Sequence, residues 1–526
     1  MPNWVLPALI AALATALVAT SVTAIMQFRA ADQARAERDA LAVEVAELRD
    51  EVEELRDRLD RADDPTGGLL EDLLGGLEDD LGGLFDGLLG DPDDETDLGG
   101  LLDDLFGSAG RAGSSAPPGA ACLTPDVAGG FDPGSLFGGS PTPTDPGALV
   151  DRVGAQVAEL RELDWQDDVE VAFLDDAATR DRLEELTALD DDARATLQAR
   201  EHLLVAMRAV DEDIDLEAVQ RQLLGDTVAG FYVPTTGETV VRVPDEGRPG
   251  PADLITLAHE LDHALTDQVL GLPDRSAPPL RSDHDAANAA LSVIEGDATL
   301  LMSRWALAHL SVVDQLRMAT DPALAGATAT LEDVPAVIVA ELLFPYTAGM
   351  DWACDRWLEG GWAAIDAAYA QPPTTTAEIL FGIPVDPATP LVPAAPGPGY
   401  EQLERTTFGA ADLRFHLDAP GGDPDRALDD ALGRAAAWGG GQSTVWADGS
   451  RTASGLSLVD NGATTTTLCT TMTEWAARAF ADAERVTTTT GVGFDAARSA
   501  AVSCTGDAVL LGFAEDLPTA RRIAGG

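Results

Sequence analysis

The chain has 526 residues, of which 91 are acidic and 33 basic, giving a net charge of −58. This length is enough for two or three domains with a sizeable core in at least one of them. So acidic a chain argues against binding to nucleic acid or to an anionic membrane surface.

The chain begins with an apolar run over residues 4–28 that carries no charge and is long enough to span a bilayer. A cleaved signal peptide is the alternative, but a basic start and an A-x-A cleavage site are missing. We therefore expect a single-pass anchor over residues 1–28.

The orientation of this anchor is set by opposing signals. Arg29, Arg35 and Arg38 follow it, and the positive-inside rule would keep the rest of the chain in the cytoplasm. The long spacer and the even cysteine count favour the opposite orientation. We expect a cell-membrane protein whose globular part is extracytoplasmic.

Residues 29–63 have the seven-residue repeat of a coiled coil. Two apolar seams repeat there: Ala34, Leu41, Leu48 and Leu55, and Val45, Val52 and Leu59. Valine at position a and leucine at position d favour a parallel homodimer, and a single solvated helix is the alternative.

Residues 64–148 are rich in Gly, Leu, Pro and acidic side chains, which oppose helix formation and collapse, so we expect a disordered linker.

Four cysteines, Cys122, Cys354, Cys469 and Cys504, occur without any C-x-x-C pair. The spacing argues against a cysteine zinc site. An even number permits two disulfides in an exported chain, and Cys469 with Cys504 is the expected pair. Four ordinary buried thiols are the alternative.

The composition becomes globular from about residue 149. A strand is expected over 168–174, a hairpin over 230–243 and helices over 251–271 and 286–310. After residue 400 we expect strands near 443–447, 456–459, 500–503 and 508–513, and a helix over 469–483. The expected fold class is α+β. A mainly helical domain with a small hairpin or sheet covers 149–395, and a small α+β module covers 396–526.

The expected helix 251–271 contains the sequence His259-Glu260-Leu261-Asp262-His263, an H-E-x-x-H motif. Residues i and i+4 lie on the same helical face, so both imidazoles can reach one ion. Glu260 lies about 100° round the helix, where it can take a proton from metal-bound water. We expect His259 and His263 to bind Zn²⁺ and Glu260 to act as the catalytic base. The alternative is a surface pair of histidines beside a solvated glutamate.

A third protein ligand is needed for zinc. The metzincin extension is excluded because Thr266 and Val269 stand where glycine and histidine are required. Glu295 is the acidic residue within the apolar stretch of helix 286–310, where an unpaired carboxylate would be costly, so it is the expected ligand. The rivals for this role are Asp283, His284, Asp285 and Asp297. Asp297 is also a candidate to orient a ligand histidine from behind, with a solvated helix face as the alternative.

The motifs G-F-Y-V-P, H-E-L-D-H-A-L-x-D-Q and E-G-D-A, in this order, resemble a group of uncharacterised prokaryotic proteins related to gluzincin (thermolysin-like) metallopeptidases. The resemblance spans roughly residues 165–485 and includes the Tyr-x-x-Gly, Gly-Gly-Trp and Pro-Pro-x-x-Thr patterns within 344–380. The chain departs from the group at Phe381-Gly382, where His-Pro is frequent, and at Gly441, where aspartate is usual. The resemblance implies a zincin-like fold and peptidase activity, and it names no substrate.

Tyr346 is a candidate to stabilise the oxyanion, because gluzincins often use a tyrosine or histidine for this. The alternative is a core tyrosine with a satisfied hydroxyl. Asp267 and Gln268 are expected to cap or orient the motif helix. His202, His309 and His416 are expected to be ordinary helix or core histidines.

These patterns predict a membrane-anchored, coiled-coil-dimerised zinc metallopeptidase of gluzincin type that acts on a peptide or protein substrate. One alternative is a catalytically silent surface protein that keeps the fold and serves as a binding or scaffold module. Another is a zinc hydrolase acting on a non-peptide bond. The intact Glu260 disfavours the silent protein, since a binding module has no chemical need for a base.

Overall fold

The structure is a computed structural model that describes most of the chain from residue 120 onward. The described residues are 120–123, 143, 145–243, 249–275, 280–311, 314, 318, 330, 331, 334–449, 451–487 and 491–525. The predicted anchor (1–28), the predicted coiled coil (29–63) and most of the predicted linker lie outside them. None of the described helices combines the length and hydropathy needed to cross a membrane.

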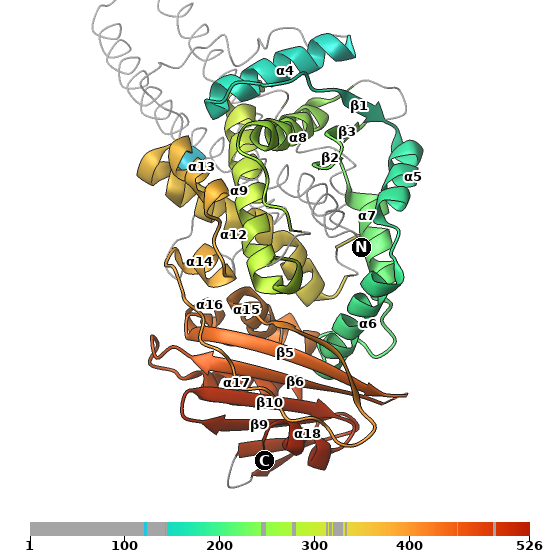
Figure 1. Cartoon of the computed structure of the whole chain (residues 1–526), viewed down its shortest axis with the longest axis vertical. Coiled ribbons are helices and arrows are strands. Elements are labelled where there is room, and N and C mark those ends of the chain that lie inside the picture. The colour runs from blue at the N-terminus through green and yellow to red at the C-terminus, as the bar shows by residue number, and fades with distance from the viewer. Residues whose placement is uncertain are drawn as a thin grey trace, which may run out of the picture. The chain divides into compact units, whose positions relative to one another are not determined.

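A mainly helical part occupies the described residues between 145 and 381 (Figure 1). Its described helices are α4 (Pro146–Arg161), α5 (Asp176–Thr187), α6 (Asp191–Ala206), α7 (Leu216–Thr227), α8 (Pro251–Val269), α9 (His284–His309), α12 (Ala336–Gly360), α13 (Trp362–Ala370) and α14 (Thr376–Phe381). An aspartate before the first turn accepts a backbone N–H in five of them: Asp145, Asp175, Asp190, Asp215 and Asp283. Some of the many acidic residues therefore serve as helix N-caps. There the carboxylate accepts a hydrogen bond from a backbone N–H that has no partner within the helix, and it interacts favourably with the partial positive charge of the helix N-terminus.

A three-stranded sheet lies against α8. It contains β1 (Val171–Leu174), β2 (Gly230–Val233) and β3 (Glu238–Arg242) in the order β1-β3-β2. β1 runs parallel to β3, and β2 pairs antiparallel with β3. The predicted hairpin over 230–243 and the predicted strand within 168–174 are confirmed.

The C-terminal part is built on a seven-stranded antiparallel sheet with the order β4-β5-β6-β10-β9-β8-β7. Its strands are β4 (Glu401–Thr407), β5 (Trp438–Asp448), β6 (Arg451–Asp460), β7 (Glu484–Thr487), β8 (Gly491–Asp495), β9 (Ser499–Thr505) and β10 (Ala508–Ala514). Its α-helices are α15 (Ala410–Asp418), α16 (Ala431–Ala435), α17 (Leu468–Ala479) and α18 (Leu517–Ile523). Short 3₁₀ turns occur at Leu280–Ser282, Pro420–Gly422 and Pro424–Arg426. The four predicted strands and the predicted helix are present, but β4, β7 and β8 were not predicted.

Alternation along the strands explains why helices cover both faces of this sheet. Val509, Leu511 and Phe513 of β10 point into a core that contains Trp475 of α17. Side chains of opposite parity, such as Ala514, pack with α18 on the other face. The core around Trp475 also contains Leu203 and Met207, at the end of α6. The predicted helical domain and the predicted C-terminal module therefore share buried contacts.

Disulfides pair all the cysteines of the described residues. Cys469 bonds to Cys504, which confirms the expected pair, and Cys122 bonds to Cys354 on α12. Cys122 lies in a 3₁₀ turn, Ala120–Leu123, and its side chain and that of Leu123 are buried. The prediction of a disordered linker is wrong for these four residues. A disulfide and a small buried contact are features that a compositional argument cannot detect.

Candidate metal centre

Helix α8 carries the H-E-x-x-H motif through the centre of the helical part. Pro251 occupies its first turn, and the Asp253 carboxylate accepts a hydrogen bond from the backbone N–H of Gly250 at 2.7 Å. The helix ends before Gly271, whose φ of +79° favours glycine. Every residue from Leu254 to Thr266 is buried, because α4, α9 and the β2–β3 hairpin surround the helix. The predicted helix is confirmed, and the alternative of a surface histidine pair is wrong.

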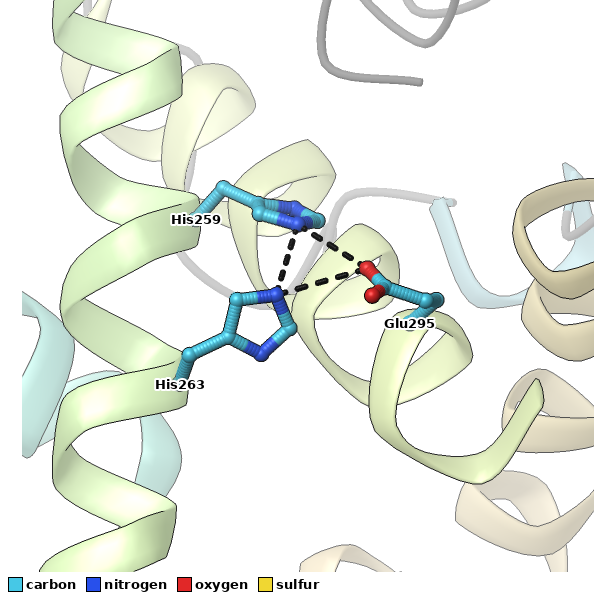
Figure 2. A group of neighbouring side chains, drawn as sticks. All are labelled: His259, His263 and Glu295. Carbon is cyan, nitrogen blue, oxygen red and sulfur yellow. Dashed lines mark hydrogen bonds and ion pairs between the residues drawn. The ribbon is translucent and has the colours of Figure 1, made fainter. Parts of the chain in front are cut away.

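Three side chains converge between α8 and α9, as Figure 2 shows. His259 Nε2 and His263 Nε2 lie 3.0 Å apart, and each lies 3.3 Å from Glu295 Oε2. All three residues are buried. A tetrahedral zinc ion with ligand bonds of about 2.05 Å holds its ligand atoms about 3.3 Å apart. The triangle therefore has the size that such an ion requires, and the donor set of two imidazoles and one carboxylate suits zinc.

The electrostatics of this group indicate a site for positive charge. Burial and, to a smaller extent, the neighbouring His263 lower the pKa of His259 to about 4. Burial also disfavours the charged form of His263, but the Glu295 carboxylate outweighs it and raises that pKa to about 9. Burial opposes ionisation of Glu295, yet the two histidines hold its pKa at about 2. The carboxylate thus requires one cationic partner, a role that a metal ion fills together with two neutral imidazoles.

Glu260 lies beside the triangle and takes no part in it. Its side chain is fully buried, and neither carboxylate oxygen has a hydrogen-bond partner among the described residues. Burial raises its pKa to about 8. A buried carboxylate without a partner is costly, so its retention next to a candidate metal site points to a chemical role.

A close crossing of α9 and α12 positions Glu295 and Tyr346. Gly296 and Gly349 meet there, and a Cβ at Gly296 would lie 2.2 Å from the carbonyl oxygen of Gly349. The Tyr346 ring stacks on the His259 ring with centroids 6.4 Å apart. Its hydroxyl is buried and has no hydrogen-bond partner within the described ranges. Burial and the nearby Glu295 carboxylate raise the pKa of this phenol well above its usual value. Tyr346 is thus buried, as the alternative of a core tyrosine expects, but no described group accepts a well-formed hydrogen bond from its hydroxyl.

We call His259, His263 and Glu295, with the adjacent Glu260 and Tyr346, the metal group. Behind it lies a buried network around Arg161 of α4. Its Nη2 donates to Asp297 Oδ2 at 2.9 Å and to Asp366 Oδ1 at 2.6 Å, and its Nε lies 3.8 Å from Asp262 Oδ1. The Tyr369 hydroxyl also donates to Asp297 Oδ2, at 2.7 Å. The alternative of a solvated face for Asp297 is wrong, since this side chain is buried. No hydrogen bond joins Asp297 to a ligand histidine among the described residues, so Asp297 links α9 to α4 and α13.

Arg161 was not among the predicted residues, although the sequence of α4 carries a signal for its burial. Leu149, Val153 and Val157 form an apolar stripe with four-residue spacing on α4, and Arg161 continues it. An arginine in line with a buried stripe predicts a buried, paired guanidinium.

The rivals of Glu295 have other partners. Asp283 caps α9 and accepts the Thr407 hydroxyl at 2.7 Å, and Asp285 accepts the backbone N–H of Thr376. His284 Nε2 lies 3.6 Å from Glu341 and 3.8 Å from Asp412. His259, His263 and Glu295 are the one group of potential metal ligands within the described part of the chain.

The remaining predicted residues have structural roles. Asp267 accepts the Tyr232 hydroxyl and the Leu272 N–H, and Gln268 Oε1 accepts the N–H groups of residues 166 and 167. These contacts confirm the expectation that both residues cap or orient. His416 is buried between Phe408 and Trp475.

Comparisons of the chain with protein-family models, with curated proteins and with solved structures found no match. The chemistry of the metal group therefore has to be inferred from its own residues.

Proposed function

We propose that this protein is a zinc metallopeptidase of gluzincin type. The observation that carries the proposal is the buried triangle of His259, His263 and Glu295, with the unpartnered carboxylate of Glu260 beside it. The resemblance of the motif order to gluzincin relatives supports the same activity. A zinc ion held by these three ligands would supply an acidified water and polarise the scissile carbonyl.

The chain's own residues would handle the proton and the developing charge. Glu260 takes a proton from the attacking water and passes it to the leaving amine, as a base with a raised pKa is suited to do. The Tyr346 hydroxyl, which lacks a partner, donates a hydrogen bond to the oxyanion that forms on the peptide carbonyl. Exclusion of water from this buried site strengthens both interactions.

The test is metal content of the full chain purified in detergent, for wild type, His263→Ala, Glu295→Gln and His309→Ala. We expect about one zinc per chain in wild type and in the His309→Ala control, and loss in both ligand variants. Wild type should cleave a mixed peptide library, and Glu260→Gln should bind zinc without cleaving. Zinc without cleavage in wild type would favour the binding or scaffold protein. Absence of zinc from folded wild type would refute the proposal.

We further propose that the chain is anchored by residues 1–28, dimerises through residues 29–63 and works outside the cytoplasm. The pairing of all the described cysteines supports an oxidising compartment. Protease added to intact cells should remove the globular part if it is extracytoplasmic. Protection of that part until the cells are lysed would refute this topology.

A further inference from the structure

A cavity of about 420 Å³ is lined in part by the first turns of α9 and α12, the helices that carry Glu295 and Tyr346. Its walls come from α6, α7, the first turns of α9 and α12, and strands β4 and β5. Much of the wall is apolar, with Leu197, Leu203, Val219, Leu223, Ile338 and Leu342 among the lining residues. Leu342 lies one helical turn before Tyr346 on α12, which places this end of the cavity close to the metal group. The volume and lining are typical of a site for a small ligand or a substrate segment.

Arg275 also lines this cavity, and it differs from the other two arginines there. Arg200 forms an ion pair with Glu341, and Arg281 is exposed to solvent. Arg275 Nε and Nη1 are buried, and neither has a hydrogen-bond acceptor among the described residues. Two of the three guanidinium nitrogens of this half-buried side chain are thus buried without an acceptor among the described residues.

Arg275 lies within the electrostatic range of Glu295 and Tyr346. Burial lowers its pKa to about 10, and the charges of Glu295 and Tyr346 act in the opposite direction. Arg275 therefore remains charged at neutral pH. Glu295 is shared with His259 and His263, so it offsets the charge of the guanidinium only in part.

Buried guanidinium N–H groups without an acceptor are costly, and guanidinium binds carboxylates through two parallel hydrogen bonds. We propose that Arg275 binds a carboxylate of the peptide substrate next to the scissile bond, while an adjoining apolar side chain enters the cavity. This inference rests on the proposed function in taking the ligand to be a peptide. The carboxylate comes either from the substrate's C-terminus or from an Asp or Glu side chain.

The experiment measures peptide binding by calorimetry to the full chain carrying Glu260→Gln, which prevents turnover. The first probe pair is N-acetyl-Leu-Leu with a free or an amidated C-terminus. The second pair is N-acetyl-Leu-Glu-amide against N-acetyl-Leu-Gln-amide. Each titration is made with zinc and again after chelation, because a carboxylate could also bind the metal directly.

We expect at least a tenfold preference for the charged member of one pair, with and without zinc. The pair that shows it identifies the source of the carboxylate. Addition of Arg275→Gln should abolish the preference, and Arg275→Lys should retain part of it. Arg281→Gln, at an exposed arginine of the same cavity, should leave it unchanged. Melting curves establish that each variant is folded.

Equal affinity within both pairs in the parent protein, or a preference that survives Arg275→Gln, would overturn the inference. Its failure is separable from failure of the proposed function. An Arg275-dependent preference in a chain that neither holds zinc nor cleaves peptides would retain the carboxylate site and refute only the hydrolase. Zinc-dependent cleavage without the preference would refute the carboxylate site and retain the hydrolase.

Discussion

Substitution of Gly296 by alanine tests whether the crossing of α9 and α12 sets the position of the third metal ligand. Gly296 follows Glu295 directly, and its added Cβ would lie 2.2 Å from the carbonyl oxygen of Gly349. Ordinary contacts of this kind are about 3.4 Å, so the two helices have to separate locally by about 1 Å. Glu295 is carried on the displaced segment.

Two opposing terms give the expected size of the effect. Alanine in place of glycine inside a helix gains about 1 kcal/mol. Overpacking of a tight contact costs about 1–3 kcal/mol, and the atom met here is rigid backbone, which favours the upper end. We expect a net loss of about 1–2 kcal/mol in the free energy of unfolding of the metal-free protein. Because metal–ligand distances tolerate only about 0.2 Å of error, zinc affinity should fall by about 10- to 100-fold.

The assay combines urea unfolding of the chelated full chain with zinc competition against a chromophoric chelator. Gly154→Ala is the matched control, since it is the same substitution inside α4 and its Cβ would meet Trp165 at an ordinary 3.7 Å. It should raise stability by up to about 1 kcal/mol and leave zinc affinity unchanged. Wild-type stability and zinc affinity in Gly296→Ala would refute the idea that this crossing positions Glu295.

Three other predictions concern stability, each measured by urea unfolding. Burial lowers the pKa of His416 to about 3, so the unfolded chain binds its proton first as pH falls below about 6.5. Between pH 7 and pH 5, wild type should lose about 2 kcal/mol more than His416→Leu. Arg161→Met leaves Asp262 and Asp297 buried without their cation and should cost about 3–5 kcal/mol. Serine at both Cys122 and Cys354 opens a loop with a sequence separation of 232 and should cost up to about 5 kcal/mol.

Each of these three has its own control or contradicting result. Equal acid sensitivity of wild type and His416→Leu would show that His416 is not the group responsible. Arg180→Met removes a half-exposed ion pair and should lower the free energy of unfolding by less than about 1 kcal/mol. If Arg161→Met lowered it by no more than Arg180→Met, the stabilising role of the buried network would be contradicted. The disulfide between Cys469 and Cys504 closes a loop with a sequence separation of only 35, so its replacement by two serines should cost less. A larger loss there than at Cys122 and Cys354 would contradict the loop-length argument.

The metal group was predictable because each of its parts has a local signature. His259 and His263 are spaced by one helical turn, and Pro251 and Gly271 mark the ends of their helix. Glu295 is conspicuous as an acid within an apolar helical run. The strands β5, β6, β9 and β10 were predictable for a similar reason, since apolar and β-branched residues concentrate in them.

The parts that sequence analysis missed depend on tertiary contacts. β4 reads Glu-Gln-Leu-Glu-Arg-Thr-Thr, and β7 is a short polar strand at the other edge of the sheet, so neither has an apolar pattern. Arg275 lies in the connection after α8, where an arginine ordinarily faces water. Its partial burial in the wall of the cavity depends on α6, α7, α9 and α12, which are distant in sequence, so the local sequence does not predict it.

The disulfide between Cys122 and Cys354 closes a covalent ring that contains every residue of the metal group, from His259 to Tyr346. Tension applied to the chain ahead of residue 122 would pass through the sulfur bridge directly into α12. The backbone between the two cysteines would carry none of that load. A protein tethered at its N-terminal end, as we propose, could therefore be pulled by flow or by a moving surface without α4 or α8 being peeled away. Reduction of this one bond would redirect the same force through α4 and its buried Arg161, toward the site itself.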